Sequence, residues 1–204
     1  KCIHIFVANQ KEYTEYSKEL SDYKIIVAQK GITPARNFIL NFFPLGKHIV
    51  MIDDDVKAFL ELDHGKLKPL SSLKRLISKG FKLAEKEGAS LWGIYPVANP
   101  FFMSQGYSKN LKFVLGTFFG TINPGTGKNG VDVKYSEKDD YERSILSWER
   151  DGVIVRMNDV TLRTAFYKEP GGMQSDPKRL EKQQVAVKRL LKKWPQYVRL
   201  NPKR

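Results

Sequence analysis

Apolar runs of five to seven residues alternate with longer amphipathic segments over the first half of the chain. β-Branched and aromatic residues fill these runs, which is typical of buried strands. We therefore predict strands at 2–8, 23–28, 48–52 and 91–97. The segments between them carry apolar residues at helical spacing. Helices are predicted there at 11–21, 34–42 and 70–87. Such alternation is typical of a parallel sheet covered on both faces.

The second half of the chain adds further strands and helices. We predict strands at 112–122 and 153–157, a loop at 123–129, and helices at 137–150 and 176–194. A length of 204 residues is enough for one domain with its own core and short for two. The sequence thus predicts a single α/β domain with a mostly parallel central sheet flanked by helices.

Composition excludes several classes of protein. A hydrophobic content of 41% argues against intrinsic disorder, and the single cysteine, Cys2, excludes a disulfide scaffold. No apolar run approaches the roughly 18 to 20 residues that cross a bilayer, and the first residues lack a signal pattern. We therefore expect a cytoplasmic protein without a transmembrane segment, in the host cytoplasm if the chain is viral.

The net charge of +13 is concentrated at the end of the chain. Residues 176–204 hold ten basic and two acidic side chains, so they carry +8 and leave +5 for the first 175 residues. This tail has an apolar stripe that predicts a packed helix with a solvated basic back. The stripe consists of Leu180, Val187, Leu190, Leu191 and Trp194. The alternative is a surface that meets phosphates, either of DNA or of a membrane.

Three consecutive acids, Asp53, Asp54 and Asp55, follow the strand predicted at 48–52. Like charges at this spacing raise one another's pKa unless a cation offsets them. Oxygen ligands favour a hard divalent ion such as Mg²⁺ or Mn²⁺. Parallel sheets bind ligands at the carboxyl ends of their strands, where Asn9 and Lys30 also fall. The alternative is a solvated strand end or a helix cap.

A second acidic cluster opens the helix predicted at 137–150. A carboxylate there could take the proton of a hydroxyl group that attacks a substrate, and Asp140 or Asp139 is the candidate. The alternative is structural, because the helix dipole favours acids in any first turn.

The chain resembles the GT-A class of nucleotide-sugar glycosyltransferases. Asp53-Asp54-Asp55 fits the Asp-X-Asp motif of that class, and the upstream segment 29–37 (QKGITPARN) is similar to the one that lies along the nucleotide. The string GITPARNFIL…IVMIDDDV is most similar to glycosyltransferases of large DNA viruses, such as chlorovirus capsid-glycan enzymes, and to TET-associated glycosyltransferases. The resemblance is strongest over residues 1–60.

This resemblance implies a GT-A-like domain over 1–175. Its nucleotide-sugar-binding half would be 1–100 and its acceptor half 101–175, with a basic helix and tail at 176–204 that could lead to a further domain. The donor would be a nucleoside-diphosphate sugar, with a UDP-sugar favoured, and the acceptor a hydroxyl of a glycan or glycoprotein.

It also implies roles for individual residues. Asp53 and Asp55 would hold Mn²⁺ or Mg²⁺ on the donor diphosphate, and Asp140, or else Asp139, would act as the base of an inverting reaction. The implied donor contacts are Ala8, Asn9, Lys30, Gly31, Arg36, Asp53 and Asp54. Ordinary surface charge is the alternative for Lys30 and Arg36, and a turn-forming role for Asn9.

One feature departs from the GT-A pattern. Many members of the class complete the metal shell with a histidine near the C-terminus, but the three histidines here are His4, His48 and His64. Water, Asp176 or the loop 171–174 could replace it. Glycosylation of a hydroxymethylated DNA base, a metal-dependent nuclease and a non-catalytic nucleic-acid-binding module remain alternative functions.

Overall fold

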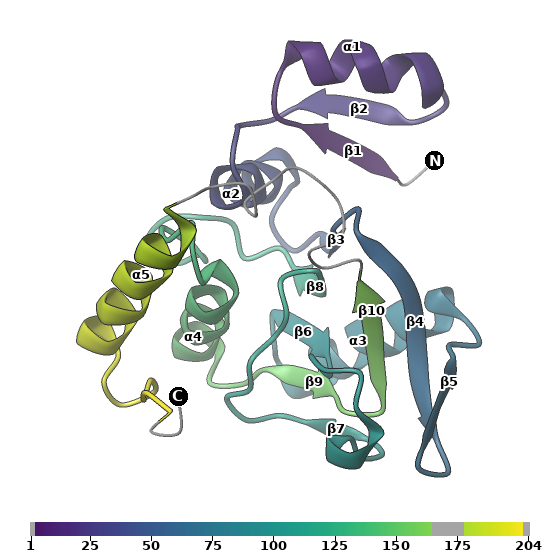
Figure 1. The fold of residues 1–204 in the computed structure, drawn as a ribbon, viewed down its shortest axis with the longest axis vertical. Helices are drawn as coiled ribbons and strands as arrows, with labels where there is room; N and C mark the ends of the chain where they lie inside the picture. The colour runs from purple at the N-terminus through teal and green to yellow at the C-terminus, as the bar shows by residue number, and fades with distance from the viewer. Residues whose placement is uncertain (1–2, 165–177, 202–204) are drawn as a thin grey trace.

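A five-stranded mixed sheet lies at the centre of the computed structural model, which describes residues 3–164 and 178–201 (Figure 1). In spatial order its strands are β3 (His48–Ile52), β8 (Phe118–Ile122), β6 (Leu91–Ile94), β9 (Val155–Met157) and β7 (Tyr107–Ser108). Only β6 and β9 pair in parallel, and the other three pairings are antiparallel.

The prediction of a mostly parallel central sheet is therefore wrong. A parallel connection needs a crossover, usually a helix. Between β6 and β8 the chain instead forms the 3₁₀ turn η1 (Pro100–Phe102) and the short strand β7, so β8 returns antiparallel between β3 and β6. Residues 112–117, which the sequence analysis included in a long strand, precede β8 without strand structure.

Three strands that the sequence analysis missed form a second, antiparallel sheet. Its order is β10 (Val160–Thr164), β4 (Val56–Asp63) and β5 (Lys66–Pro69). His64 and Gly65 join β4 to β5 in a two-residue turn, and both have positive φ angles, 45° and 76°. Such a turn matches the twist of a hairpin. The alternation of apolar and polar residues in β4 could have revealed this strand.

The first two strands form a small sheet of their own. β1 (His4–Val7) and β2 (Lys24–Val27) pair in parallel through α1 (Gln10–Glu19) and do not pair with β3. Aromatic rings attach β1 to the rest of the molecule, since Phe6 lies 5.7 Å from the ring of Phe42 and His4 5.2 Å from that of Phe43. The expectation that the first three predicted strands end at one sheet edge is therefore wrong.

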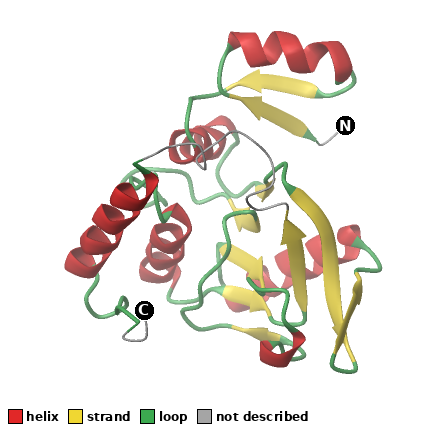
Figure 2. Ribbon diagram, viewed as in Figure 1, coloured by secondary structure: helices red, strands yellow, loops and turns green. Residues whose placement is uncertain are grey.

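The other four helices are α2 (Ile32–Phe42), α3 (Leu73–Glu87), α4 (Asp139–Asp151) and α5 (Arg179–Lys193) (Figure 2). The core centres on Trp92 of β6, which is fully buried. A Cβ added at Gly80 of α3 or Gly120 of β8 would lie 2.6 or 2.1 Å from its indole ring. Glycine at both positions therefore lets α3 and β8 approach the Trp92 ring closely.

Helix α5 packs along α4, as predicted for the tail. Leu190 and Trp194 are buried with Ile145 of α4, and the Trp194 indole Nε1 donates to Glu149 at 2.8 Å. Leu180, which we assigned to the buried stripe, is instead 74% exposed. None of the helices in the described ranges is both long and apolar enough to cross a bilayer.

Candidate functional site

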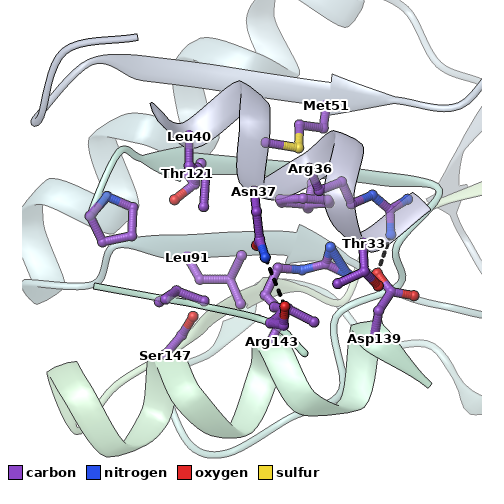
Figure 3. A pocket seen from close by; sticks show the side chains of 14 residues that line it. Thr33, Arg36, Asn37, Leu40, Met51, Leu91, Thr121, Asp139, Arg143 and Ser147 are labelled. Carbon is purple, nitrogen blue, oxygen red and sulfur yellow. Dashed lines mark hydrogen bonds and ion pairs between the residues drawn. The ribbon is translucent and has the colours of Figure 1, made fainter. Parts of the chain in front are cut away.

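The guanidinium of Arg36 joins the two acidic clusters of the sequence, and Figure 3 shows its contact with one of them, Asp139. Its Nη2 donates to both carboxylate oxygens of Asp53, at 3.0 and 3.2 Å, and to the Gly116 carbonyl at 2.8 Å. Its Nη1 donates to Asp139 at the start of α4. Acids that lie far apart in the sequence thus share one cation.

Local structure places Arg36 on the inner face of α2. The helix begins after Gly31, whose φ of 101° suits glycine, and buries Thr33, Arg36 and Leu40 along one side. The hydroxyl of Thr33 donates to the Tyr135 carbonyl at 2.9 Å, which ties α2 to the segment before α4. A helix with one face towards the core therefore directs its arginine inwards.

The ends of β3 and β8 supply the other side of this site. The Asp53 amide donates to the Thr117 carbonyl at 2.9 Å, so the β3–β8 pairing continues one residue into the acidic cluster. A Cβ at Gly116 would lie 2.8 Å from Arg36 Nη1. Glycine at this position therefore allows the guanidinium to reach the backbone carbonyl.

Burial and charge act against each other at this ion pair. Arg36 is only 8% exposed, and burial alone would lower its pKa. The charges and hydrogen bonds of Asp139 and Asp53 outweigh burial, so the pKa of Arg36 is raised. At Asp53 burial dominates over the attraction of Arg36, and the pKa of that carboxyl is raised.

A second buried arginine, Arg143 of α4, lies beside this group. Its Nη2 is 3.5 Å from an oxygen of Asp139, and its guanidinium lies 3.9 Å from the centre of the Phe119 ring. Complete burial lowers the pKa of Arg143 to about 10. A cavity of about 20 Å³ borders it, and Thr33 and Asn37 line the same cavity. That volume is enough for one water molecule, and the guanidinium nitrogens of Arg143 make no hydrogen bond to the described chain.

Asp140, the preferred candidate base, follows Asp139 in the first turn of α4. Burial and the negative charge of Asp139 raise the pKa of its carboxyl, and Arg143 opposes them only in part. One carboxylate oxygen accepts from the Tyr141 amide at 2.9 Å. A carboxylate with a raised pKa is a stronger base than an ordinary aspartate, which suits Asp140 to take a proton from a hydroxyl group.

An open groove of about 420 Å³ lies between α2 and the chain at 133–136. Its volume is within the range of small-molecule sites, roughly 300 to 1,000 Å³. Gln29, Thr33, Pro34 and Asn37 of the segment predicted to lie along a nucleotide line one wall, and the chain at 133–136 lines the other. Thr33 and Asn37 also border the cavity next to Arg143, so the groove and the charged site share a wall.

The predicted donor contacts divide into two groups. Ala8 and Asn9 cap α1: the Asn9 side chain accepts from the Glu12 amide at 3.0 Å, and the Ala8 amide donates to the Glu12 carboxylate at 2.7 Å. This is a reciprocal capping arrangement. No hydrogen bond or ion pair within the described ranges links either residue to Arg36.

The remaining predicted contacts lie nearer to the site. Lys30 and Asp54 are exposed, and Gly31 precedes α2. Arg36 was expected to meet a diphosphate, but both of its terminal nitrogens are engaged by protein groups. In the structure it acts as a link between β3, β8 and α4.

The carboxylates of Asp53 and Asp55 offer two ligands to a metal ion. Within the described part of the chain, no group of three or more His, Cys, Asp or Glu side chains could hold one. Two carboxylates nevertheless fit Mg²⁺ or Mn²⁺, because such ions keep waters and take phosphate oxygens of the substrate as further ligands. The Asp53 side chain is 35% exposed, so its ion pair with Arg36 leaves one side open. Asp176 and the loop 171–174, named as replacement ligands, lie outside the described residues.

Sequence reasoning missed Arg143 and Glu142 as parts of this site. Asp139 and Arg143 are four residues apart, a spacing that pairs opposite charges on a helix and could have drawn attention to Arg143. Glu142 is fully buried and accepts from the amides of Lys134 and Tyr135, each at 2.8 Å. It thereby fixes the wall of the groove onto α4.

Comparisons with known proteins identify no relative: no family model, no curated protein and no solved structure matches this chain.

Proposed function

We propose that this protein is a metal-dependent glycosyltransferase that moves a sugar from a nucleoside-diphosphate sugar, with a UDP-sugar favoured, to a hydroxyl group of a glycan or glycoprotein. The observation that carries the proposal is the shared ion pair of Arg36 with Asp53 and Asp139. It holds the Asp-X-Asp segment beside the helix that bears Asp140. The groove along segment 29–37 supports the same proposal, because it is large enough for a nucleotide.

Each group has one task in this reaction. Asp53 and Asp55 would hold the cation, which supplies Lewis-acid stabilisation of the departing diphosphate. Asp140 takes the proton of the acceptor hydroxyl as its oxygen bonds to the anomeric carbon. The bond from that carbon to the diphosphate oxygen breaks in the same step, and the nucleoside diphosphate leaves with the electron pair. Arg36 holds the two acidic clusters next to each other through its ion pairs with Asp53 and Asp139.

Calorimetry and turnover assays together test this function. We expect UDP to bind the wild-type protein with Mn²⁺ and to lose affinity in EDTA. Asp55→Asn should remove the metal-dependent part of binding. Asp140→Asn should keep it and lower turnover by about 10²- to 10⁴-fold, the usual contribution of a general base.

Asp63→Asn is the matched control, since Asp63 is an acid of the β4 hairpin outside the site. This variant should change neither the metal-dependent binding of UDP nor the turnover. If a panel of UDP- and GDP-sugars shows no metal-dependent binding to the wild-type chain, the proposed function is wrong.

A metal-dependent nuclease is the second candidate. It is favoured by one observation: Asp53, which follows β3, and Asp139, in the first turn of α4, share the Arg36 guanidinium. Cleavage of plasmid DNA in Mg²⁺, abolished by Asp53→Asn, would support it over sugar transfer.

A further inference from the structure

Helix α5 has one face that the protein covers and one that it leaves to solvent. Ala186, Leu190 and Trp194 are each at most 4% exposed, and Leu190 and Trp194 pack with Ile145 of α4. Figures 1 and 2 both draw α5 beside α4 at the outer side of the molecule. The packing of these apolar residues therefore determines which side chains of α5 face outwards.

The outward side carries a cluster of cations, which we call the α5 basic face. It consists of Lys188, Arg189, Lys192 and Lys193. At about 100° per residue these four positions cover roughly 140° of the helix circumference, within an axial length of about 8 Å. All four residues are exposed, and among the described residues none has a carboxylate within 4.0 Å. The aromatic contacts of Arg189 and Lys193, with Tyr135 and Trp194, leave their charge uncompensated.

Helix α3 is also rich in basic residues, but some of its cations have a carboxylate close by. It carries five basic residues, but carboxylates lie close to two of them. Lys79 lies 3.1 Å from Asp159, and Lys86 lies 4.0 Å from Glu87. The dipole of α5 favours cations in its last turn, yet it amounts to only about half a charge and cannot balance four.

We propose that the α5 basic face binds the phosphate backbone of nucleic acid. Four unbalanced cations on one rigid helix attract a polyanion and release the counterions condensed on it. A membrane surface is the less suitable partner, because a helix that lies on lipid needs an apolar face, and α5 uses that face against α4. Its exposed apolar residues, Leu180 and Val185, are five positions apart and therefore point about 140° away from each other. This proposal does not depend on the proposed glycosyltransferase function.

Fluorescence anisotropy with the full chain tests the proposal, using a labelled 20-base-pair duplex as DNA and as RNA in EDTA without any sugar donor. Four phosphate contacts predict a fall in affinity of about 150-fold between 50 and 200 mM salt, because each contact contributes about 0.9 to the logarithmic slope. The double variant Lys188→Gln with Lys192→Gln should lower that slope by about 1.8. A double variant on α3, Lys74→Gln with Lys82→Gln, removes the same net charge from exposed positions and should keep the slope of the wild type.

Three results would overturn the proposal. The wild-type chain could fail to bind either duplex at 50 mM salt. Both double variants could weaken binding equally, which would assign it to overall charge. Vesicles of phosphatidylserine could bind in a manner that depends on Lys188 and Lys192 while the duplexes do not, which would assign the α5 basic face to a membrane. Circular dichroism of both variants verifies that each is folded.

Discussion

Two charged regions of this molecule differ in how their charges are balanced. Around Arg36, two arginines and two aspartates form a chain of ion pairs in which only Asp53 is partly exposed, and the formal charges of these four residues cancel. On the α5 basic face, four cations lie in solvent without a nearby carboxylate among the described residues. The first region determines local geometry, and the second produces a field that extends beyond the protein.

The two regions differ because one is shielded from water and the other is exposed to it. Inside the protein a charge without its partner is costly, so each member of the Arg36 network depends on the others. At the surface, water screens each lysine, and single removals change stability little. We therefore expect substitutions in the Arg36 network to lower the free energy of unfolding and the turnover. Substitutions on the α5 basic face should instead weaken the binding of nucleic acid.

The largest effect on stability is expected for Arg36→Met. It would leave the buried Asp139 and the partly buried Asp53 without their shared cation, and breaking a buried ion pair typically costs about 3–5 kcal/mol. Urea unfolding measures this loss. Lys192→Met, which removes one charge from the α5 basic face, should change stability by at most about 0.5 kcal/mol. Equal losses in the two variants would contradict the comparison.

The second-largest loss of stability is expected for a substitution on the buried side of α5. Leu190→Ala removes a side chain that is 2% exposed and should cost about 2–5 kcal/mol in thermal or urea unfolding. Leu180→Ala removes the same atoms from a position that is 74% exposed, and it should be close to neutral. A substantial loss in the Leu180 variant would instead support the apolar stripe predicted from the sequence.

Asp140→Asn should have a smaller effect on stability, and of the opposite sign. The folded state raises the pKa of Asp140, so the protonated carboxyl is favoured by folding and the carboxylate is not. The stability that protonation contributes is complete below the unfolded pKa and is lost as pH rises through the raised folded pKa. The asparagine side chain of the variant does not titrate, so its gain over the wild type should grow across that interval and then level off.

Unfolding of both proteins across a pH series measures this trend. Asp54→Asn, which alters an exposed acid of the other cluster, is the control and should stay within about 0.5 kcal/mol of the wild type throughout. A gain that is independent of pH would show that Asp140 is not held in an unfavourable charged state.

The smallest effect on stability is expected for the α5 double variant Lys188→Gln with Lys192→Gln. Its free energy of unfolding should differ from that of the wild type by at most about 0.5 kcal/mol, measured in urea at 150 mM salt. A gain at low salt that disappears at high salt would indicate repulsion within the α5 basic face. Loss of stability at all salt concentrations would show that these lysines have a structural role.

Much of the local structure could be predicted because it depends on neighbours in the chain. The predicted helices at 11–21, 70–87 and 137–150 correspond to α1, α3 and α4 with ends displaced by at most three residues. Helical periodicity and capping residues such as Ser72 and Gly88 are local signals. The hairpin of β4 and β5 was missed, since His64-Gly65 is a less obvious turn than Asn-Gly.

By itself, the sequence determined where the helices lie, where the acids cluster and that the last helix is basic and amphipathic. Only the tertiary structure decided the strand directions, the separation of the β1–β2 sheet and the encounter of Arg36 with both acidic clusters. The physical reason is the distance along the chain between the residues that interact. Periodicity, capping and charge composition depend on residues a few positions apart, whereas Arg36 meets Asp139 across 103 positions. Such a pairing depends on how helices and strands pack, and a single sequence does not show that packing directly.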